Sequence, residues 1–412
     1  KHKTLFMPNI LFLLLWTVGA GIVNSNYAGI LDINNETNVH IIIAIIAFNC
    51  ASLLFCRNYR IKLSKKELCE LLDISQLWNK ILILNLSMVI FCFPYFLKMA
   101  RIMLTQSFYE VRVQAYIYSN FYELVCSKII NMPMFALFNI LLIITVLKMA
   151  LGEKNNLKLY LLMIFDIVFF SIITGSRNYI AKPFIYFFIA YAFIHSISKE
   201  KLHIKPRIIL ICIITVVVLD KAIQARSLHG LSPIENIVVY LFGGIAYYDK
   251  IVFSGKFQAE NAIKLYGQGV FGWIISPLLY LLSLLKITPD YVAESIIGRV
   301  SSQGVYISNT YNFNALTTSL YPMWRDFGVF GIVFGMMVFA IVVSLHRNRL
   351  FRCCNQKNLL IYFSFVCAVS ECTQYYELLF IRFTVQILLI LIIWRRKTNR
   401  KRMLNEVIKW NN

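Results

Sequence analysis

The hydrophobic positions of the chain gather in long runs that are separated by shorter polar segments. Each run approaches the roughly 20 residues that an α-helix needs to cross a bilayer. The runs lie at 5–23, 39–56, 81–100, 132–150, 159–174, 179–197, 207–222, 324–345, 358–373 and 378–394. The pattern predicts an all-α polytopic membrane protein with about ten transmembrane helices.

Every second polar segment is rich in Lys and Arg, so the basic segments all fall on one side of the predicted membrane. Starting from a cytoplasmic N-terminus, the cytoplasmic side receives RNYRIKLSKKELCELLDISQLWNK, SKEKLHIKPR, HRNRLFRCCNQK and WRRKTNRKR. Cytoplasmic loops of membrane proteins carry an excess of Lys and Arg. We therefore expect the N and C termini to be cytoplasmic. The first run follows Lys1-His2-Lys3 directly, which predicts an uncleaved signal anchor.

Composition agrees with lipid as the main solvent, because 59% of residues are hydrophobic and only 15% are charged. The net charge of +21 would suggest nucleic acid in a soluble protein. Here the basic clusters lie beside predicted spans, so we expect no nucleic-acid partner. No CxxC and no zinc-like spacing occurs. We expect no disulfide framework, no metal and no cofactor.

Two longer segments fall on the outer side, at 101–131 and 223–323. The second is a large loop within what we interpret as a single integral membrane domain, residues 1–412. It contains two apolar stretches, IVVYLFGGIAYYDKIVF and GWIISPLLYLLSLLKI, which are short for a span. We interpret them as interfacial or re-entrant helices, and either form suits 271–286. No internal repeat is evident.

Charged residues on the outer side of such a protein are candidates for function. Arg177 lies in TGSRNY between two short predicted helices. An arginine here can anchor the hairpin or contact an anion just above the membrane. Gly175 and Ser176 would let a ligand approach the backbone, and a guanidinium binds phosphate with two parallel hydrogen bonds.

The start of the large loop, DKAIQARSLHG, holds a second candidate pair. Arg226 and His229 fall at i and i+3, on one face of a helix continuing from the preceding run. A cation beside a neutral imidazole suits a pyrophosphate ligand and a proton acceptor. A snorkelling arginine and a surface histidine are the alternative.

The end of the loop is rich in neutral hydrogen-bonding and aromatic residues, as a sugar site would be. Arg325 and Asp326 follow it and lead into Gly331 and Gly335, a GxxxG spacing that permits close helix packing. The alternative for Arg325 and Asp326 is a local salt bridge. The further substrate-binding candidates of this region are Arg299, Asn314, Thr317 and Tyr321.

Four other ionisable residues lie in or beside predicted spans. Asp166 and Glu371 are within runs, and Glu377 and Arg382 flank the last outer turn. Buried carboxylates can relay protons in a transporter, or they can pair with a neighbouring arginine.

Two elements resemble the bacterial oligosaccharide repeat-unit polymerases, the O-antigen polymerases called Wzy. TGSRNY resembles a T-G-S-R-G-like element of that family. YNFNALTTSLYPMWRDFGVFG resembles its N-x-x-T-x-x-x-x-x-x-R-D-F-G-x-x-G-like element. The matching residues of the second element are Asn314, Thr317, Arg325, Asp326, Phe327, Gly328 and Gly331. The predicted topology is similar to the family's along the whole chain.

The resemblance implies a glycosyltransferase of GT-C-like architecture in the bacterial inner membrane, acting on the periplasmic face in lipopolysaccharide O-antigen biosynthesis. It would polymerise oligosaccharide repeat units carried on undecaprenyl pyrophosphate, beside a chain-length regulator and a flippase. Arg226, Arg177 and Arg325 would contact the pyrophosphate. His229 would be the base, and Asp326 would orient Arg325 or act as the base itself.

Two alternatives stay open. An O-antigen ligase or another lipid-linked glycosyltransferase would share this architecture, and His229 beside Arg226 resembles the ligases. A flippase for lipid-linked oligosaccharides is disfavoured by the long outer loop and the missing repeat. No Walker, GxSxG or HExxH motif is present, which argues against cytosolic nucleotide chemistry.

Overall fold

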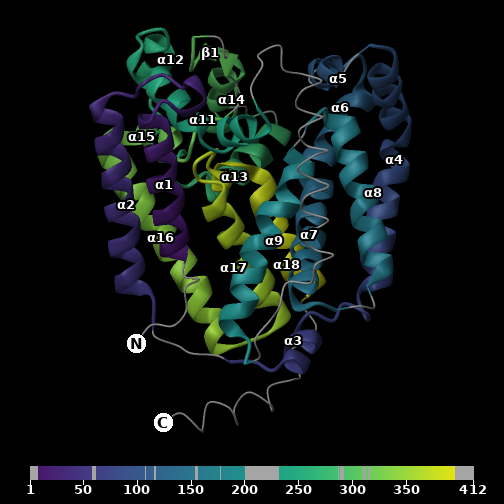
Figure 1. Cartoon of the computed structure of the whole chain (residues 1–412). Helices are drawn as coiled ribbons and strands as arrows, with labels where there is room; N and C mark the ends of the chain where they lie inside the picture. Colours follow the sequence, from purple (N-terminus) through teal and green to yellow (C-terminus); the bar gives the residue numbers. More distant parts are fainter. Residues whose placement is uncertain are drawn as a thin grey trace.

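The computed structural model places the predicted apolar runs that it describes in helices, drawn side by side in Figure 1. It describes residues 8–57, 62–106, 108–115, 117–153, 156–176, 178–199, 232–285, 287, 292–309, 312–313 and 316–394. The predicted span 207–222 and the predicted site residues Arg177, Arg226, His229 and Asn314 lie outside the described residues.

The elements fall into two groups along the chain. Up to residue 199 they are α1 (Pro8–Asn24), η1 (Tyr27–Gly29), α2 (Asn35–Phe55), α3 (Lys65–Leu71), α4 (Trp78–Thr105), α5 (Phe108–Gln114), α6 (Phe121–Ile129), η2 (Ile130–Met134), α7 (Phe135–Leu151), α8 (Leu157–Thr174) and α9 (Asn178–Ile197). From residue 232 they are α11 (Pro233–Phe253), α12 (Gln258–Ala262), α13 (Gly272–Leu284), α14 (Ala293–Ser302), β1 (Val305–Tyr306), β2 (Asn312–Phe313), α15 (Leu320–Phe327), α16 (Val329–Arg352), α17 (Gln356–Ser370), η3 (Glu377–Leu379) and α18 (Ile381–Ile393). The two short strands pair antiparallel, with Val305 opposite Phe313.

Within the described part of the chain, seven helices are long and apolar enough to cross a membrane, and α1, α13 and α18 are shorter apolar helices. Many of their leucine, isoleucine and phenylalanine side chains are exposed, including Leu54, Ile90 and Phe330. Apolar side chains gain nothing from water but are compatible with lipid tails. The protein is therefore an all-α polytopic membrane protein.

The described connections gather at two ends of the helices. At one end, Leu31 donates to the carbonyl of Ile307 at 2.8 Å, and α11 to α15 cover this end (upper in Figure 1). We call it the loop end. At the opposite end, Leu63 donates to Ile197, and the Asn348 amide donates to Phe55 at 2.7 Å. The long helices run between these two ends.

Helix α7 is the centre of the bundle. All its residues except Met149 are buried. The preceding π-turn η2 contains Pro133, whose missing N–H leaves a backbone carbonyl without its usual helical donor. The Asn139 amide donates to Gln386 of α18 at 3.2 Å, and Gln386 donates to Ser364 of α17 at 2.8 Å. A helix buried on all sides holds its neighbours in fixed positions, which suits it to carry a site.

Helix α11 corrects one prediction. We expected its apolar stretch to be too short for a span. The helix begins before that stretch, at a capping box formed by Ser232 and Glu235, and has 21 residues. Its contacts nevertheless lie at the loop end. The Leu241 carbonyl accepts from Thr373 after α17, and Tyr248 bonds to His40 near the start of α2 at 2.8 Å.

Helix α13, the other apolar stretch of the loop, lies over the start of α18. Thr384 of α18 donates to the Trp273 carbonyl, and the Ser276 hydroxyl donates to the Leu379 carbonyl at 3.2 Å. Gly272 permits this approach, since a Cβ there would lie 2.7 Å from the Cα of Leu379. The helix contains Pro277. The loop end is therefore built partly from short helices laid on the long ones.

Candidate functional site

The turn between α8 and α9 begins the candidate site. Gly175 ends α8 in the left-handed region at φ 57°, where glycine avoids the steric cost that a side chain would carry. A Cβ at this position would also lie 2.7 Å from the main-chain nitrogen of Arg112. The Ser176 hydroxyl then accepts from the N–H of Asn178, the first residue of α9, at 3.3 Å. The turn fixes where α9 starts.

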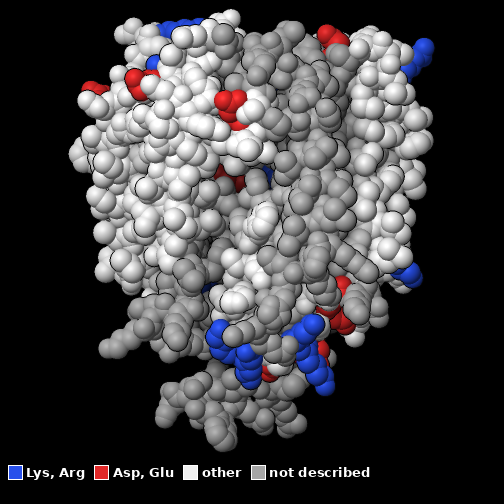
Figure 2. Space-filling view, in the orientation of Figure 1, with Lys and Arg blue, Asp and Glu red and all other residues white. Residues whose placement is uncertain are grey.

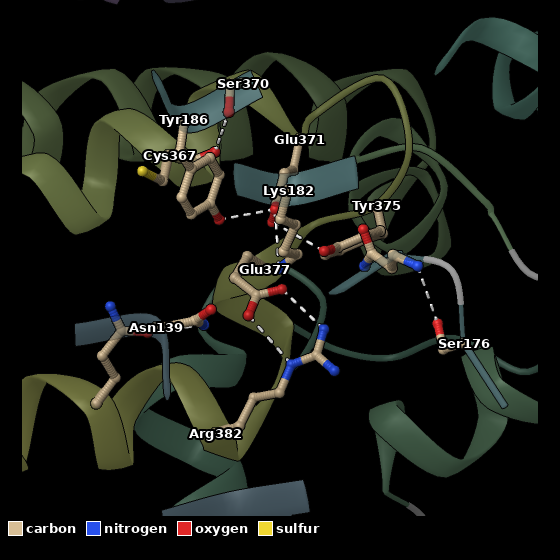
Figure 3. Close-up of polar contacts among 12 residues, drawn as sticks. Asn139, Ser176, Lys182, Tyr186, Cys367, Ser370, Glu371, Tyr375, Glu377 and Arg382 are labelled. Atoms are coloured by element: carbon tan, nitrogen blue, oxygen red, sulfur yellow. Dashed lines mark hydrogen bonds and ion pairs between the residues drawn. The ribbon is translucent and has the colours of Figure 1, made fainter. Parts of the chain in front are cut away.

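One turn into α9, Lys182 enters a buried polar cluster (Figure 3). Its ammonium lies 2.9 Å from Oε1 of Glu371, and the two side chains are 1% and 3% exposed. Tyr186, one helical turn further along α9, donates to the same oxygen at 2.8 Å. Tyr375 donates to Oε2 at 2.9 Å. Glu371 thus receives two tyrosine hydroxyls and one lysine.

A second ion pair lies beside the first. Arg382, in the first turn of α18, donates from Nε to Oε1 of Glu377 at 3.1 Å and from a terminal nitrogen to Oε2 at 2.8 Å. This is the planar two-bond arrangement that arginine forms with carboxylates. The expectation that a carboxylate here pairs with a neighbouring arginine is confirmed for Glu377. Figure 3 shows both ion pairs facing one another.

Aromatic rings hold the two cations together. Phe135 of α7 lies 5.1 Å from the Lys182 ammonium and 4.5 Å from the Arg382 guanidinium carbon. Tyr375 lies 5.8 Å and 5.6 Å from the same groups. Cation–π attraction grows when the cation is removed from water. We call these side chains, Lys182, Tyr186, Glu371, Tyr375, Glu377 and Arg382, the charge cluster.

The charged side chains of the charge cluster are removed from water. Lys182, Glu371 and Glu377 are between 1% and 5% exposed, and Arg382 is 24% exposed. Transferring an ion from water to such surroundings costs several kcal/mol in real proteins. Two opposite pairs give zero net charge, which offsets much of that cost.

The loop motif, residues 316–327 with α15 at its end, lies next to the turn between α17 and α18. Thr318 donates to the Gln374 carbonyl at 2.9 Å, and Ser319 donates to the Cys372 carbonyl at 2.8 Å. Gly244 of α11 packs against the same turn, and a Cβ there would lie 2.7 Å from the Thr373 oxygen. The motif therefore positions the turn between Glu371 and Glu377.

Arg325, at the centre of the motif, is fully buried and binds protein groups. Its Nε and one terminal nitrogen donate to the Ile263 carbonyl at 3.2 and 2.7 Å. The other terminal nitrogen donates to the Tyr321 hydroxyl at 2.8 Å, which donates to Asn261. Burial raises the pKa of Tyr321 to about 12. The guanidinium ties α15 to the segment after α12.

Asp326 performs a similar task on the next segment of chain. Oδ1 accepts from the N–H groups of Gly267 and Gly269 at 2.9 and 3.0 Å, and Oδ2 accepts from Val270 at 2.8 Å. Burial raises the pKa of Asp326, against the lowering effect of these three N–H groups. The suggested local salt bridge between Arg325 and Asp326 is wrong, because each side chain binds a different stretch of main chain.

Comparison with known proteins places the chain in a family. A family model described as O-antigen polysaccharide polymerase Wzy matches residues 5–259. The chain belongs to this family. No curated protein and no solved structure matches the chain. Membership in the O-antigen polymerase family implies a polymerase of glycosyltransferase type, a lipid-linked oligosaccharide substrate and a membrane environment.

The structure of this O-antigen polymerase family member separates the predicted site residues. Thr317, Tyr321, Arg325 and Asp326 are all buried at the loop end, whereas Arg299 is exposed on α14. Gly331 and Gly335 do permit close packing, against Met323 of the neighbouring α15.

Sequence reasoning missed Lys182. The available signal was a lysine inside a predicted span, 179–197, where a charge needs an explanation. The matching carboxylate lies 189 positions away, directly after the end of α17, and no spacing rule connects the two residues. Asp166, the other carboxylate predicted in a span, accepts from Asn85 of α4 at 2.8 Å.

Proposed function

We propose that this protein joins oligosaccharide repeat units linked to undecaprenyl pyrophosphate, on the periplasmic face of the bacterial inner membrane, in lipopolysaccharide O-antigen biosynthesis. The family match over residues 5–259 is the observation that carries the proposal. The enzyme would be a glycosyltransferase with a GT-C-like helical membrane domain. A chain-length regulator and a flippase would be its partners.

The distribution of charge supports the proposed orientation. Basic side chains gather at the end opposite to the loop end, visible as the blue group low in Figure 2. By the positive-inside rule that end would be cytoplasmic. The loop end, with α11 to α15 and the charge cluster, would then face the periplasm. The lipid-linked donor and acceptor would reach it from the outer leaflet.

The proposed reaction needs charge stabilisation on the leaving group. As the bond between sugar C1 and the phosphate oxygen breaks, negative charge grows on the pyrophosphate. Arginines aimed at it lower the barrier, and one such contact is worth roughly 3–4 kcal/mol. We assign Arg177 and Arg226 to the pyrophosphate and His229 to the acceptor sugar. Asn314 and Thr317 belong to the sugar-binding region, and Tyr321, whose hydroxyl is bonded to Arg325 and Asn261, supports that region from below.

We revise the proposed roles of Arg325 and Asp326 from substrate contacts to positioning residues. Their polar atoms bind main-chain groups of 263–270 and the Tyr321 hydroxyl. A group that is already satisfied and buried gains little from a ligand, since it would first have to break those bonds.

Deleting the gene and examining lipopolysaccharide on a gel tests the function. Loss of the polymerase leaves the core capped by one repeat unit. Uncapped core with polymer retained on the lipid carrier would instead identify a ligase. An absence of exposed repeat units would identify a flippase.

Arg226→Ala tests the site assignment within that function. We expect it to abolish the ladder of long chains while membrane levels of the protein stay normal, because a leaving-group contact is lost. Immunoblotting of membranes supplies the control. A full-length ladder from this variant would remove Arg226 from the site.

A further inference from the structure

We propose that the charge cluster is the reacting centre of this polymerase, with Lys182 and Arg382 binding the donor pyrophosphate and Glu377 accepting the proton of the acceptor hydroxyl. The inference rests on the proposed function and adds residues that the sequence did not indicate for it.

Lys182 has unused hydrogen-bonding capacity. An ammonium carries three N–H donors, and among the described residues Glu371 Oε1 is the one carboxylate oxygen in ion-pair contact with it. The Lys182 nitrogen is buried and makes no well-aligned hydrogen bond in that part of the chain. Its other neighbours are the rings of Phe135, Tyr186 and Tyr375. Two donors are therefore left for the oxygens of an anionic ligand.

The Glu371 and Glu377 carboxylates differ in how many hydrogen-bond and ion-pair partners they have. Glu371 accepts from two tyrosine hydroxyls and faces Lys182, so both its oxygens are used. The Glu377 carboxylate has a single partner within the described residues, Arg382. Arg382 is also the more accessible side chain of that pair, 24% exposed against 5% for Glu377. The Glu377–Arg382 pair can open from the side of Arg382.

If the Glu377–Arg382 ion pair opens, binding of the pyrophosphate donor also frees Glu377 to act as a base. A pyrophosphate offers arginine the same planar two-bond contact as a carboxylate, with more charge. When Arg382 turns to the pyrophosphate, Glu377 loses its cation and becomes a stronger proton acceptor. Lys182 lies beside Arg382 on the same Phe135 ring. The two cations can then bind one pyrophosphate together.

The chemical step balances within these groups. Glu377 takes the proton of the acceptor hydroxyl, and that oxygen forms a bond to C1 of the donor sugar. The bond between C1 and the pyrophosphate oxygen breaks, and its electron pair stays on undecaprenyl pyrophosphate. Lys182 and Arg382 stabilise the new charge. Glu371 and the tyrosines Tyr186 and Tyr375 hold Lys182 in place and do not touch the substrate.

Position in the fold supports this assignment. The charge cluster joins α7, α9, the turn after α17 and α18. Its first residue in the chain, Lys182, follows the TGSRNY element by about one helical turn. The 316–319 segment bonds directly to its turn. Both elements that resemble the polymerase family thus lead to the same buried charges.

The test uses the full-length protein, purified in detergent and returned to vesicles with lipid-linked repeat units from a deletion strain. Glu377→Gln keeps the shape of the side chain and removes the proton acceptor. We expect its turnover to fall by about 100-fold or more. Thermal stabilisation by added undecaprenyl pyrophosphate should be at least that of the wild type, because Arg382 no longer has to leave a carboxylate. Glu377→Asp should restore part of the rate.

Lys182 is tested by a variant that leaves no unpaired charge. Lys182→Met alone strands Glu371 and can prevent folding, so the double variant Lys182→Met/Glu371→Gln is compared with it. We expect the double variant to fold and to make no polymer. It should need about tenfold more undecaprenyl pyrophosphate than the wild type for the same thermal stabilisation. Lys148→Met, at the buried Lys148–Glu153 pair of the opposite end, is the matched control and should retain polymerisation per folded molecule.

The outcomes separate the two proposals. Polymer from Glu377→Gln or from the Lys182 double variant at near wild-type rate would overturn the inference and leave the polymerase function standing. Wild-type protein that elongates no lipid-linked units in the same vesicles would refute the function itself, and the inference with it.

Discussion

Two arginine–carboxylate combinations lie at the loop end of this protein, and they use their charges differently. Arg325 and Asp326 are neighbours in sequence, yet they bind main-chain groups on different stretches of the loop. Glu377 and Arg382 bind one another. The first combination is the more deeply buried, with Arg325 0% and Asp326 1% exposed.

The difference separates a structural charge from a reactive one. Main-chain groups cannot leave without moving the whole loop, so Arg325 and Asp326 are held permanently. A side-chain partner can be replaced by a ligand of like charge at small structural cost. Arg325 and Asp326, which looked most like substrate contacts in the sequence, therefore act as a structural clamp on the loop segment 263–270. Their motif also positions the turn that holds Glu377.

Asp326→Ala should produce the largest effect on stability in this comparison. Three buried N–H groups lose their acceptor, and each costs about 1–3 kcal/mol when unsatisfied. We expect a loss above about 3 kcal/mol, seen as a much lower unfolding temperature in detergent and a low membrane yield. Glu377→Gln is the contrasting variant and should lose less stability, because its amide oxygen can still accept from Arg382 and that side chain is 24% exposed. Equal unfolding temperatures for the two variants would remove the distinction between clamp and exchangeable pair.

Much of the fold was predictable, because lipid imposes a simple rule on the sequence. Long apolar runs become helices, and α2, α4, α8 and α9 begin and end within a few residues of the predicted limits. Helix α11 was misjudged in length. Its capping box at Ser232 and Glu235 lies outside the apolar stretch, so hydrophobicity alone placed its start too late.

The site was only partly predictable, for a geometric reason. Glu377 and Arg382 are five residues apart, and sequence suggested that such residues could pair. Lys182 and Glu371 are on segments that meet only after the bundle packs around α7, and no local pattern records that meeting. Arg325 and Asp326 looked reactive because no side chain in the sequence could be identified as their partner. Their partners are main-chain groups, the Ile263 carbonyl and N–H groups of 267–270, which any residue type can supply.

Gly244→Ala tests whether the turn needs its close support from α11, and its effect on stability should be smaller. A Cβ would lie 2.7 Å from the Thr373 carbonyl, so the turn between Glu371 and Glu377 must shift. We expect about 1–3 kcal/mol of destabilisation and a larger relative loss of polymerisation per folded molecule. The measurement is the polymer ladder normalised to folded protein.

Gly298→Ala is the matched control for that variant, since nothing lies within 4 Å of its added Cβ. It sits inside α14, where alanine is favoured over glycine by about 1 kcal/mol. Polymerisation should be unchanged. If both alanine variants polymerise equally well, the position of the turn does not depend on contact with α11.

Arg299→Ala should have the smallest effect, because Arg299 is a cation at the loop end that is exposed. Its guanidinium is not required for packing, and exposed substitutions usually change stability by less than about 0.5 kcal/mol. As the substrate-binding residue that the sequence suggests, Arg299 would make an exposed ionic contact worth about 0.2–1 kcal/mol. Its loss predicts a KM raised by roughly one and a half- to fivefold, with kcat unchanged. Steady-state elongation in vesicles, with Glu377→Gln measured alongside, gives both constants. A fall in kcat for Arg299→Ala would mean that an exposed loop cation acts in the transition state, and the contrast between buried reactive charges and peripheral ones would not hold.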